Sequence, residues 1–260
     1  MTAAGQVRKG EQYFWPLVTL VIFVAVWHYA VRISGSKIFP SPLDVQRGME
    51  EMLFTGVLWN YIGDSLRRVA LGYLLAAVLG IPAGLMLGWY PAAAQVVNPA
   101  IQMIRPISPI AWIPVSIIWF GVDDEAAVYL IFLASFFPIV VAAMNGVRNT
   151  PAMFRQAGRN FGLTPGALLA RVVFPAVLPQ IIVGLRIALG IAWLVVVAAE
   201  MIAVDSGLGY MVIEARNSGK RYDLVVAAMI LIGVIGLALD SGFRLIEKMK
   251  SVRWGFGHES

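Results

Sequence analysis

The chain has 260 residues, of which 59% are hydrophobic and only 13% are charged, with a formal net charge of +5. Soluble domains carry about 25% charged residues, so this composition excludes a soluble globular protein and indicates a polytopic α-helical membrane protein. The sequence has no cysteine and two histidines, which excludes a disulfide scaffold and thiol chemistry and argues against a metal site. In a membrane protein an excess of positive charge is related to the orientation of the chain in the membrane and to contact with membrane lipid. No nucleic acid partner is expected.

Apolar runs of about 20 residues predict one all-α domain over residues 1–260 with about six spanning helices. The third span is expected to be irregular because it carries four prolines. An amphipathic interfacial helix is expected between residues 32 and 64, a polar loop at 205–223 and a basic tail at the end of the chain. The predicted spans are residues 13–31, 69–89, 93–120, 126–147, 180–204 and 224–246.

The distribution of charge predicts that both termini lie in the cytoplasm. With that orientation, ten Lys and Arg residues lie inside and eight outside, which is a small bias. The loop over residues 148–178 strengthens this orientation. The loop carries four arginines, and no acid occurs anywhere from 126 to 199. A purely cationic loop is typical of the cytoplasmic side.

Three glycines in the second span, Gly80, Gly84 and Gly88, recur every four residues. Glycines at this spacing share one helix face and allow another backbone to approach closely. The pattern fits either packing within the chain or a seam between subunits.

Polar residues inside the third and fifth spans are the candidates for a path through the membrane. Arg105 lies mid-span beside Pro106 and Ser108, and a proline-broken helix at membrane depth belongs where it lines a cavity. Two roles remain open for Arg105: lining a path for an anion, or forming a structural pair with Glu200. Glu200, Arg186 and Asp240 are each expected to pair across helices with a partner that the sequence does not identify. The candidate path residues are Arg105, Pro106, Ser108 and Glu200.

The cationic loop carries several start and stop signals for short helices. Thr150 and Pro151 predict the start of one helix, Gly162 its end, and Thr164 with Pro165 the start of a second. Pro175 and Pro179 are expected to break the chain before the fifth span. A compact helix–turn–helix of this kind fits a docking surface, with helix-in-groove recognition as its mode. The candidate docking residues are Phe154, Arg155, Gln156, Ala157, Gly158, Arg159, Gly162 and Pro175.

The loop resembles the "EAA" coupling loop of ABC importer permeases. The similarity lies in Gln156-Ala157-Gly158 followed by Gly162 and the downstream prolines, with Gln156 in place of the family's Glu and Gly158 in place of its second Ala. Other segments, among them Ser65 to Val69, Arg105-Pro106 and Ala198 to Met201, are similar to the nitrate, sulfonate, taurine and bicarbonate branch. The resemblance covers roughly residues 39–246.

The resemblance implies a homodimer of multi-pass permeases in the bacterial inner membrane. Each permease would dock one ATPase subunit and receive solute from a periplasmic or lipid-anchored binding protein. No catalytic residue and no cofactor are expected on this chain, because its only Gly-Lys pair, Gly219-Lys220, lacks the glycine of a phosphate-binding loop. ATP and Mg²⁺ would bind the ATPase. The expected solute is a small anion such as a sulfonate, taurine, nitrate or bicarbonate.

Three alternatives stay open on the sequence alone. A permease of the same kind for a neutral or cationic organic solute, such as a thiamine precursor, fits the same motifs. An ion-coupled secondary transporter is less consistent, because internal repeats and intramembrane acids are expected there and this chain shows no repeat and few such acids. A membrane enzyme would need a convergent set of His or paired carboxylates, which is not visible.

Overall fold

A computed structural model describes residues 11–35 and 39–247, with the side chains of residues 11–13 and 218 left out. All regular structure in these residues is helical, which confirms the all-α prediction. Five helices are long and apolar enough to cross a membrane, or six if the bent pair Pro91–Ile104 and Pro109–Phe120 is one span. The predicted basic tail, beyond residue 247, lies outside the described residues.

The described residues form two compact units. The smaller contains α1 (Glu11–Ser34), α2 (Pro42–Thr55) and the segment Val212–Ile230. The larger runs from Trp59 to Met211 and resumes at Leu231. Helices α10 (Leu208–Gly219) and α11 (Tyr222–Glu247) contribute residues to both units. The other elements of the larger unit are α3 (Val57–Trp89), α4 (Pro91–Ile104), η1 (Pro109–Trp112), α5 (Ile113–Phe120), α6 (Asp124–Asn149), α7 (Ala152–Asn160), α8 (Pro165–Leu168), η2 (Leu169–Val173) and α9 (Phe174–Glu200).

In the smaller unit, α2 is the amphipathic helix that the sequence predicts after the first span. It begins with a capping box, in which the Asp44 carboxylate accepts from the Ser41 N–H at 3.0 Å and Ser41 Oγ accepts from the Asp44 N–H at 3.3 Å. The hydrogen bonds from Ser41 hold the pKa of the Asp44 carboxyl below its usual range. Arg221 joins this helix to the start of α11 by donating to Glu51 at 2.6 Å and to Asp223 at 2.8 Å.

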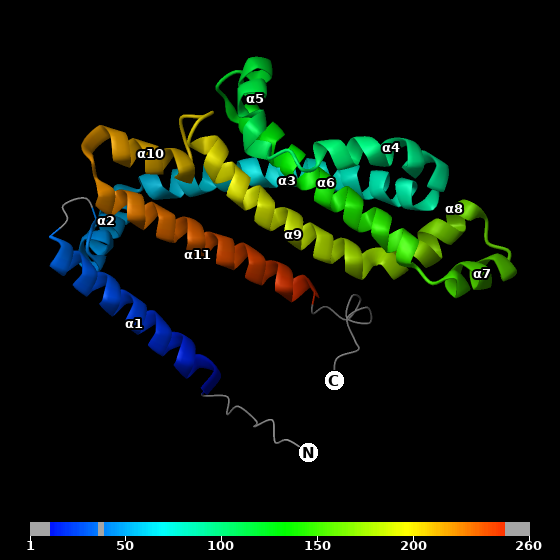
Figure 1. The fold of residues 1–260 in the computed structure, drawn as a ribbon, viewed down its shortest axis with the longest axis horizontal. Coiled ribbons are helices and arrows are strands. Elements are labelled where there is room, and N and C mark those ends of the chain that lie inside the picture. The colour runs from blue at the N-terminus through cyan, green and yellow to red at the C-terminus, as the bar shows by residue number, and fades with distance from the viewer. Residues whose placement is uncertain (1–10, 36–38, 248–260) are drawn as a thin grey trace. The chain divides into compact units, whose positions relative to one another are not determined.

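In the larger unit, the glycines of α3 pack against α6 (Figure 1). A Cβ at Gly72 would lie 2.7 Å from the Val128 carbonyl oxygen, and one at Gly88 would lie 2.6 Å from Val147 Cβ. Gly80 and Gly84 face α6 with similarly little space. The glycine stripe therefore serves packing within the chain, which decides between the two alternatives left open by the sequence.

Helix α9 packs along α6 with small and β-branched residues at the contact. Ala143 and Val147 of α6 form a buried cluster with Val173, Val177 and Ile181. Contrary to the sequence prediction, Pro175 and Pro179 do not break the chain. Pro175 follows the π-helical turn Leu169–Val173, and Pro179 lies inside α9, so the helical course continues through both prolines. Residues Pro165–Glu200 accordingly form one span of 36 residues.

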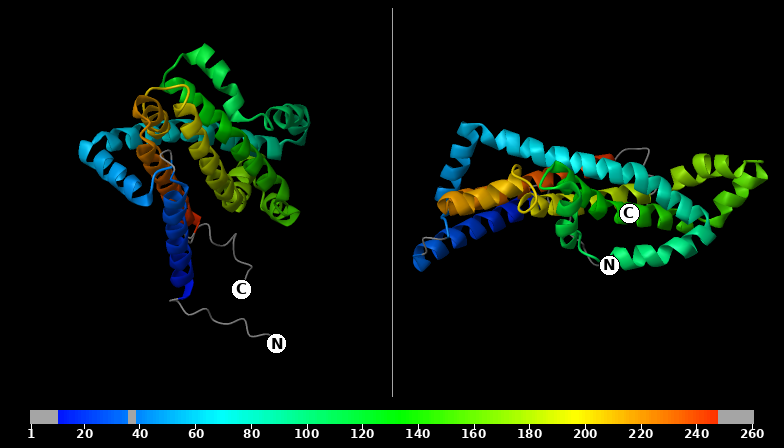
Figure 2. Two further views of the ribbon diagram at one scale, coloured as in Figure 1. Left: turned by 60° about the vertical axis from the view of Figure 1, so that its left-hand side comes forward. Right: turned by 90° about the horizontal axis from the view of Figure 1, so that it is seen from above.

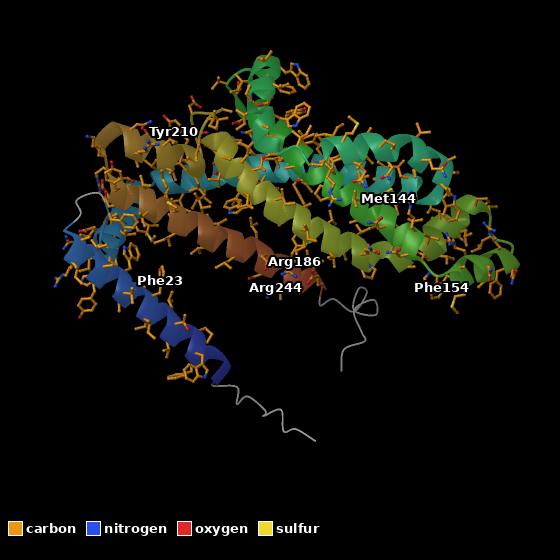
Figure 3. All side chains as sticks on the ribbon, viewed as in Figure 1. Phe23, Met144, Phe154, Arg186, Tyr210 and Arg244 are labelled. Atoms are coloured by element: carbon orange, nitrogen blue, oxygen red, sulfur yellow. The ribbon has the colours of Figure 1, made fainter. Side chains whose placement is uncertain are left out.

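The short helices α7 and α8 lie at one end of α6 and α9 (Figures 1 and 2). Figure 3 labels Phe154 of α7 and Tyr210 of α10 at opposite ends of the larger unit. Residues 205–223 are not the extended polar loop that the sequence suggested, because α10 occupies most of them. Gly207 adopts a φ of +99° and turns the chain, and Leu208 and Met211 then bury one face of α10.

Candidate functional site

Arg105 lies at the break in the third span. Helix α4 ends at Ile104, and the chain continues through a turn into η1 and α5 with a bend of 85° between the two helical parts. Pro106 and Pro109 cannot donate backbone hydrogen bonds, so the helix is weakened where it ends and the chain turns. Ile107 N–H bonds the Ile104 carbonyl at 3.0 Å, and this bond closes the turn. The irregular third span predicted from the prolines is thus a bent pair of helices.

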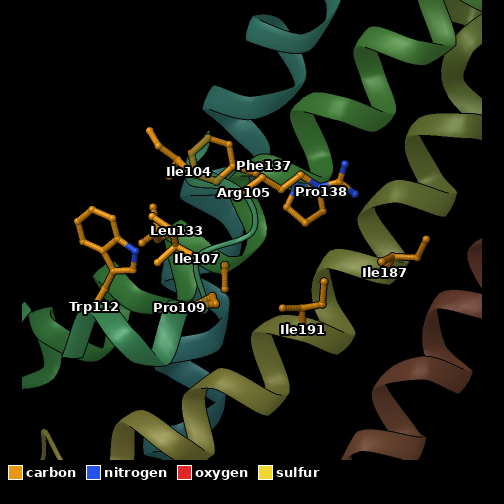
Figure 4. Close-up of a pocket in the computed structure, with 11 residues that line it drawn as sticks. Ile104, Arg105, Ile107, Pro109, Trp112, Leu133, Phe137, Pro138, Ile187 and Ile191 are labelled. Atoms are coloured by element: carbon orange, nitrogen blue, oxygen red, sulfur yellow. The ribbon is translucent and has the colours of Figure 1, made fainter. Parts of the chain in front are cut away.

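The side chain of Arg105 lines a pocket of about 240 Å³, termed here the Arg105 pocket. Nine of its eleven lining residues are wholly apolar, and they come from the turn, α6 and α9. Figure 4 shows the Arg105 guanidinium beside Pro138, with Ile187 and Ile191 of α9 across from it. Pro106 and Ser108 shape the turn without lining the pocket.

Arg105 forms no ion pair with any residue that the structure describes. The Arg105 side chain is exposed, so its unpaired guanidinium is free to attract an anion to the edge of this largely apolar pocket. The pocket also contains a donor that the sequence analysis missed. Trp112 Nε1 is buried and has no hydrogen-bond partner within the described part of the chain. Nothing in the sequence distinguished Trp112 from the other seven tryptophans.

Glu200 is fully buried, and its partner is Arg68, not Arg105. Arg68 Nη1 donates to Glu200 Oε1 at 2.9 Å. The other carboxylate oxygen accepts from Ser65 Oγ and from the Gly209 N–H, both at 2.9 Å. The structural pair between Arg105 and Glu200 suggested by the sequence is therefore wrong. Contact between Glu200 and a solute stays a prediction, and both of its oxygens are engaged within the protein.

Arg68 also reaches α6 and the segment that follows α9. It lies 2.6 Å from Asp124 Oδ1 at the start of α6 and donates to the Ser206 carbonyl at 2.9 Å. These five residues, Ser65, Arg68, Asp124, Glu200 and Ser206, are termed here the Arg68 cluster. The Ser65 hydroxyl additionally accepts from the Leu208 N–H at 2.9 Å, which ties the start of α10 to α3.

A second set of charges lies on α9 and the later part of α11. Arg186 donates to Asp240 at 2.7 Å and to Glu247 at 3.2 Å. Arg244 donates to the other oxygen of Asp240 at 2.9 Å, and Figure 3 shows Arg186 and Arg244 close together. Arg186 and Asp240 thus each form a pair across helices, as the sequence suggested without naming partners, and these groups neutralise one another.

The cationic loop folds as the predicted helix–turn–helix, with one corrected cap. Gly162 has a φ of +74° and ends α7, and the Leu163 N–H reaches back to the Gly158 carbonyl at 3.1 Å. Thr164 Oγ1 accepts from the Ala167 N–H and caps α8 as predicted. Thr150 does not cap α7. Its hydroxyl donates back to the Gly146 carbonyl at 2.9 Å in α6, and Pro151 takes the N-cap position.

The predicted docking residues of α7 lie on different faces of the helix. Phe154 and Ala157 are exposed, as are Met153 and Phe161, so these residues form an apolar outer face. Gly158 is buried, with Leu168 of α8 in the space that a Cβ would take. The remaining three, Arg155, Gln156 and Arg159, line a separate cavity beside the end of α3. Sequence reasoning missed Met153, although its helical spacing from Phe154 and Ala157 marks the same face.

Comparisons with known proteins are consistent with this architecture. A family model described as "Binding-protein-dependent transport system inner membrane component" matches residues 77–251. A putative ABC transporter permease protein of Methanocaldococcus jannaschii is 42% identical over 230 residues, covering 86% of each chain. A putative aliphatic sulfonates transport permease protein of Bacillus subtilis is 32% identical and covers 99% of this chain and 95% of its own length. A nitrate import permease protein of Synechococcus elongatus is 33% identical, covering 86% and 85%.

Among solved structures, an inward-facing form of the MetNI methionine ABC transporter aligns with a TM-score of 0.59. The alignment covers 76% of this chain and 98% of that chain at 20% identity, so it shows a shared fold.

We predict that Arg68→Ala lowers the free energy of unfolding by about 3–5 kcal/mol, because it leaves the buried Glu200 carboxylate without its cation. Arg67→Ala is the matched control. The Arg67 side chain is 68% exposed and 3.9 Å from Asp124, so its loss is expected to cost less than about 1 kcal/mol. Thermal unfolding of both variants in detergent measures the difference, and equal stability of the two would contradict the structural role of the Arg68 cluster.

Proposed function

Because the chain belongs to the family of binding-protein-dependent transport system inner membrane components, we propose that it forms the translocation path of an ATP-driven importer for a small anionic solute. The chain is a multi-pass transport component and not an enzyme, as its relatives are permeases. The relatives named for sulfonates and nitrate support an anionic solute. The observation that carries the proposal is the unpaired guanidinium of Arg105 in a pocket at the broken span.

The pocket favours this proposal over a neutral or cationic solute. A cation in the Arg105 pocket would meet a like charge with no carboxylate among its lining residues. A neutral solute could only accept hydrogen bonds from the guanidinium, whereas an anion gains stronger hydrogen bonds in which both partners are charged. Membership of this family also argues against the alternative of an ion-coupled secondary transporter.

The assembly that we propose is a homodimer with two ATPase subunits and a periplasmic or lipid-anchored binding protein. ATP and Mg²⁺ belong to the ATPase. Helix α7 is the proposed contact with the ATPase, because Met153, Phe154, Ala157 and Phe161 form an exposed apolar face of the kind that docks in a groove. Gly158 and Gly162 set the shape of the helix–turn–helix, and Pro175 opens α9 behind it.

Both termini are proposed to lie in the cytoplasm, with α7 on the same side. The chain has no native cysteine, so single cysteines report accessibility directly. Exposed positions at opposite ends of the larger unit are Asp205, after α9, and Asn160, at the end of α7. In intact cells, Asp205→Cys is expected to react with an impermeant thiol reagent and Asn160→Cys is expected to react only after permeabilisation. The reverse pattern would overturn the orientation.

For the solute path, Arg105→Ala is expected to reduce uptake severalfold while leaving the affinity of the binding protein and the yield of the complex unchanged. Arg105→Lys is expected to restore part of the uptake, since it returns the charge without the planar fork. Arg216→Ala, which removes an exposed arginine outside the pocket, is the matched control. Uptake of radiolabelled solute into proteoliposomes measures the effect. A fully assembled Arg105→Ala complex with wild-type uptake would eliminate the proposed role.

For the ATPase contact, Gly162→Val is expected to lower ATPase copurification and transport-coupled ATP hydrolysis severalfold. The reason is conformational: Gly162 has space around it, but its φ of +74° strains any β-branched side chain. Gly166→Val is the matched control, because Gly166 in α8 has equal space and a negative φ. If both variants copurify the ATPase as the wild type does, the turn is not needed for docking.

A further inference from the structure

The side chains that line the Arg105 pocket offer hydrogen-bond donors and no acceptor. Arg105 carries the guanidinium and Trp112 the indole N–H, and neither side chain can accept a hydrogen bond. The nine other lining residues have hydrocarbon side chains, so the lining contains no carboxylate, amide or hydroxyl group. An ammonium group that enters this pocket would lose hydrogen bonds to water and find no acceptor among the lining side chains.

The apolar part of the lining comes from two packed helices. Leu133 and Phe137 are four residues apart on α6, and Ile187 and Ile191 are four apart on α9, so each pair lies on one helix face. In Figure 4 the two isoleucines lie across the pocket from the Arg105 guanidinium. Ile187 is 56% exposed and Arg105 is also exposed, so a solute that enters the pocket meets an apolar surface and a cation together.

The size of the pocket exceeds that of a bare inorganic anion. Its volume of about 240 Å³ is several times the roughly 30 Å³ that a water molecule occupies in the liquid. Nitrate or bicarbonate at Arg105 would therefore leave most of the apolar lining without contact. An alkyl chain attached to the anionic group would cover that lining, and each methylene that leaves water strengthens binding about fourfold.

We propose that this pocket makes the permease itself selective, apart from any selection by a binding protein, for one class of organic anion. The favoured solute has a single oxyanion group, such as a sulfonate or a carboxylate, that accepts from Arg105. Its short alkyl chain lies against Ile187 and Ile191, and it carries no ammonium group. The disfavoured solutes are nitrate and bicarbonate, which lack the chain, and taurine, whose ammonium group needs an acceptor. This inference rests on the proposed function, because it takes the Arg105 pocket as part of the solute path.

The experiment measures solute binding to the purified permease complex without a binding protein, so that the permease alone determines the result. Radiolabelled 1-butanesulfonate is the probe, and methanesulfonate, taurine and nitrate are the competitors. Ile187→Asn places an amide oxygen in the pocket in place of an alkyl group. Leu194→Asn is the matched control, because Leu194 lies two turns further on the same face of α9, is 72% exposed and does not line the pocket. Arg105→Ala is the third variant.

The wild type and Leu194→Asn are expected to bind butanesulfonate more tightly than methanesulfonate, by about fourfold for each methylene that the pocket buries. Taurine and nitrate are expected to compete weakly. Ile187→Asn is expected to bind butanesulfonate roughly tenfold more weakly, since apolar contact is lost. It is also expected to bind taurine severalfold more tightly, since its amide oxygen accepts from the ammonium group.

Equal affinity of the wild type for butanesulfonate, methanesulfonate and taurine, with binding lost in Arg105→Ala, would overturn the selectivity and leave the proposed function intact. Equal changes in Ile187→Asn and Leu194→Asn would place the selection outside the pocket and overturn the inference in the same way. Absence of butanesulfonate binding by a wild type that binds nitrate or taurine would do so too. Solute binding that Arg105→Ala leaves unchanged would contradict both the inference and the role of Arg105 in the proposed function.

Discussion

The guanidinium of Arg68 holds together one end of the packed helices. It comes from α3 and bonds carboxylates at the start of α6 and the end of α9, as well as the Ser206 carbonyl beyond α9. In an environment without water, each buried charge needs its partners, and removing one leaves the others uncompensated. Because α3, α6 and α9 each contribute to the Arg68 cluster, none of the three can slide along the others at this end without breaking an ion pair or a charge-assisted hydrogen bond.

Because the Arg68 cluster fixes the three helices, the irregular turn that carries Arg105 lies outside their regular packing. The glycine face of α3 and the Ala143 and Val147 contacts of α6 keep the three helices in close contact along their length. The bent segment of α4 and η1 is different, since its prolines free backbone groups and its turn carries the unpaired charge of Arg105. A fixed wall from α6 and α9 thus faces a turn that is not part of the regular packing. Such a combination of rigid wall and irregular turn suits a site that binds and releases a solute.

Local signals in the sequence were sufficient for the presence of the apolar helices, the bent third span, and the Gly162 and Thr164 boundaries, because each depends on hydropathy or on the conformational preference of one residue. The predicted starts at residues 69 and 180 were too late, because those helices begin at Val57 and Pro165. The partner of Glu200 was not predictable in this way. Ser65 and Arg68 lie more than 130 positions away in the chain and just before the predicted start of the second span at residue 69, whereas α3 begins at Val57 and holds both. The two prolines also do not act as the predicted breaks: Pro175 follows the π-helical turn Leu169–Val173, and Pro179 lies inside α9. Thr150 does not cap α7, because its hydroxyl donates to the Gly146 carbonyl in the last turn of α6.

The continuity of residues Pro165–Glu200 has a mechanical consequence. At the helical rise per residue, 36 residues extend over about 54 Å. The rod begins in α8, beside the proposed ATPase contact, and carries Ile187 and Ile191 of the Arg105 pocket on its way to Glu200. With the Glu200 end held by Arg68, a tilt of about 5° moves the α8 end by about 5 Å, from the same helical rise. Ile187 and Ile191 of the pocket are thus joined to α8 by continuous helix, including the π-helical turn Leu169–Val173, with no loop between them.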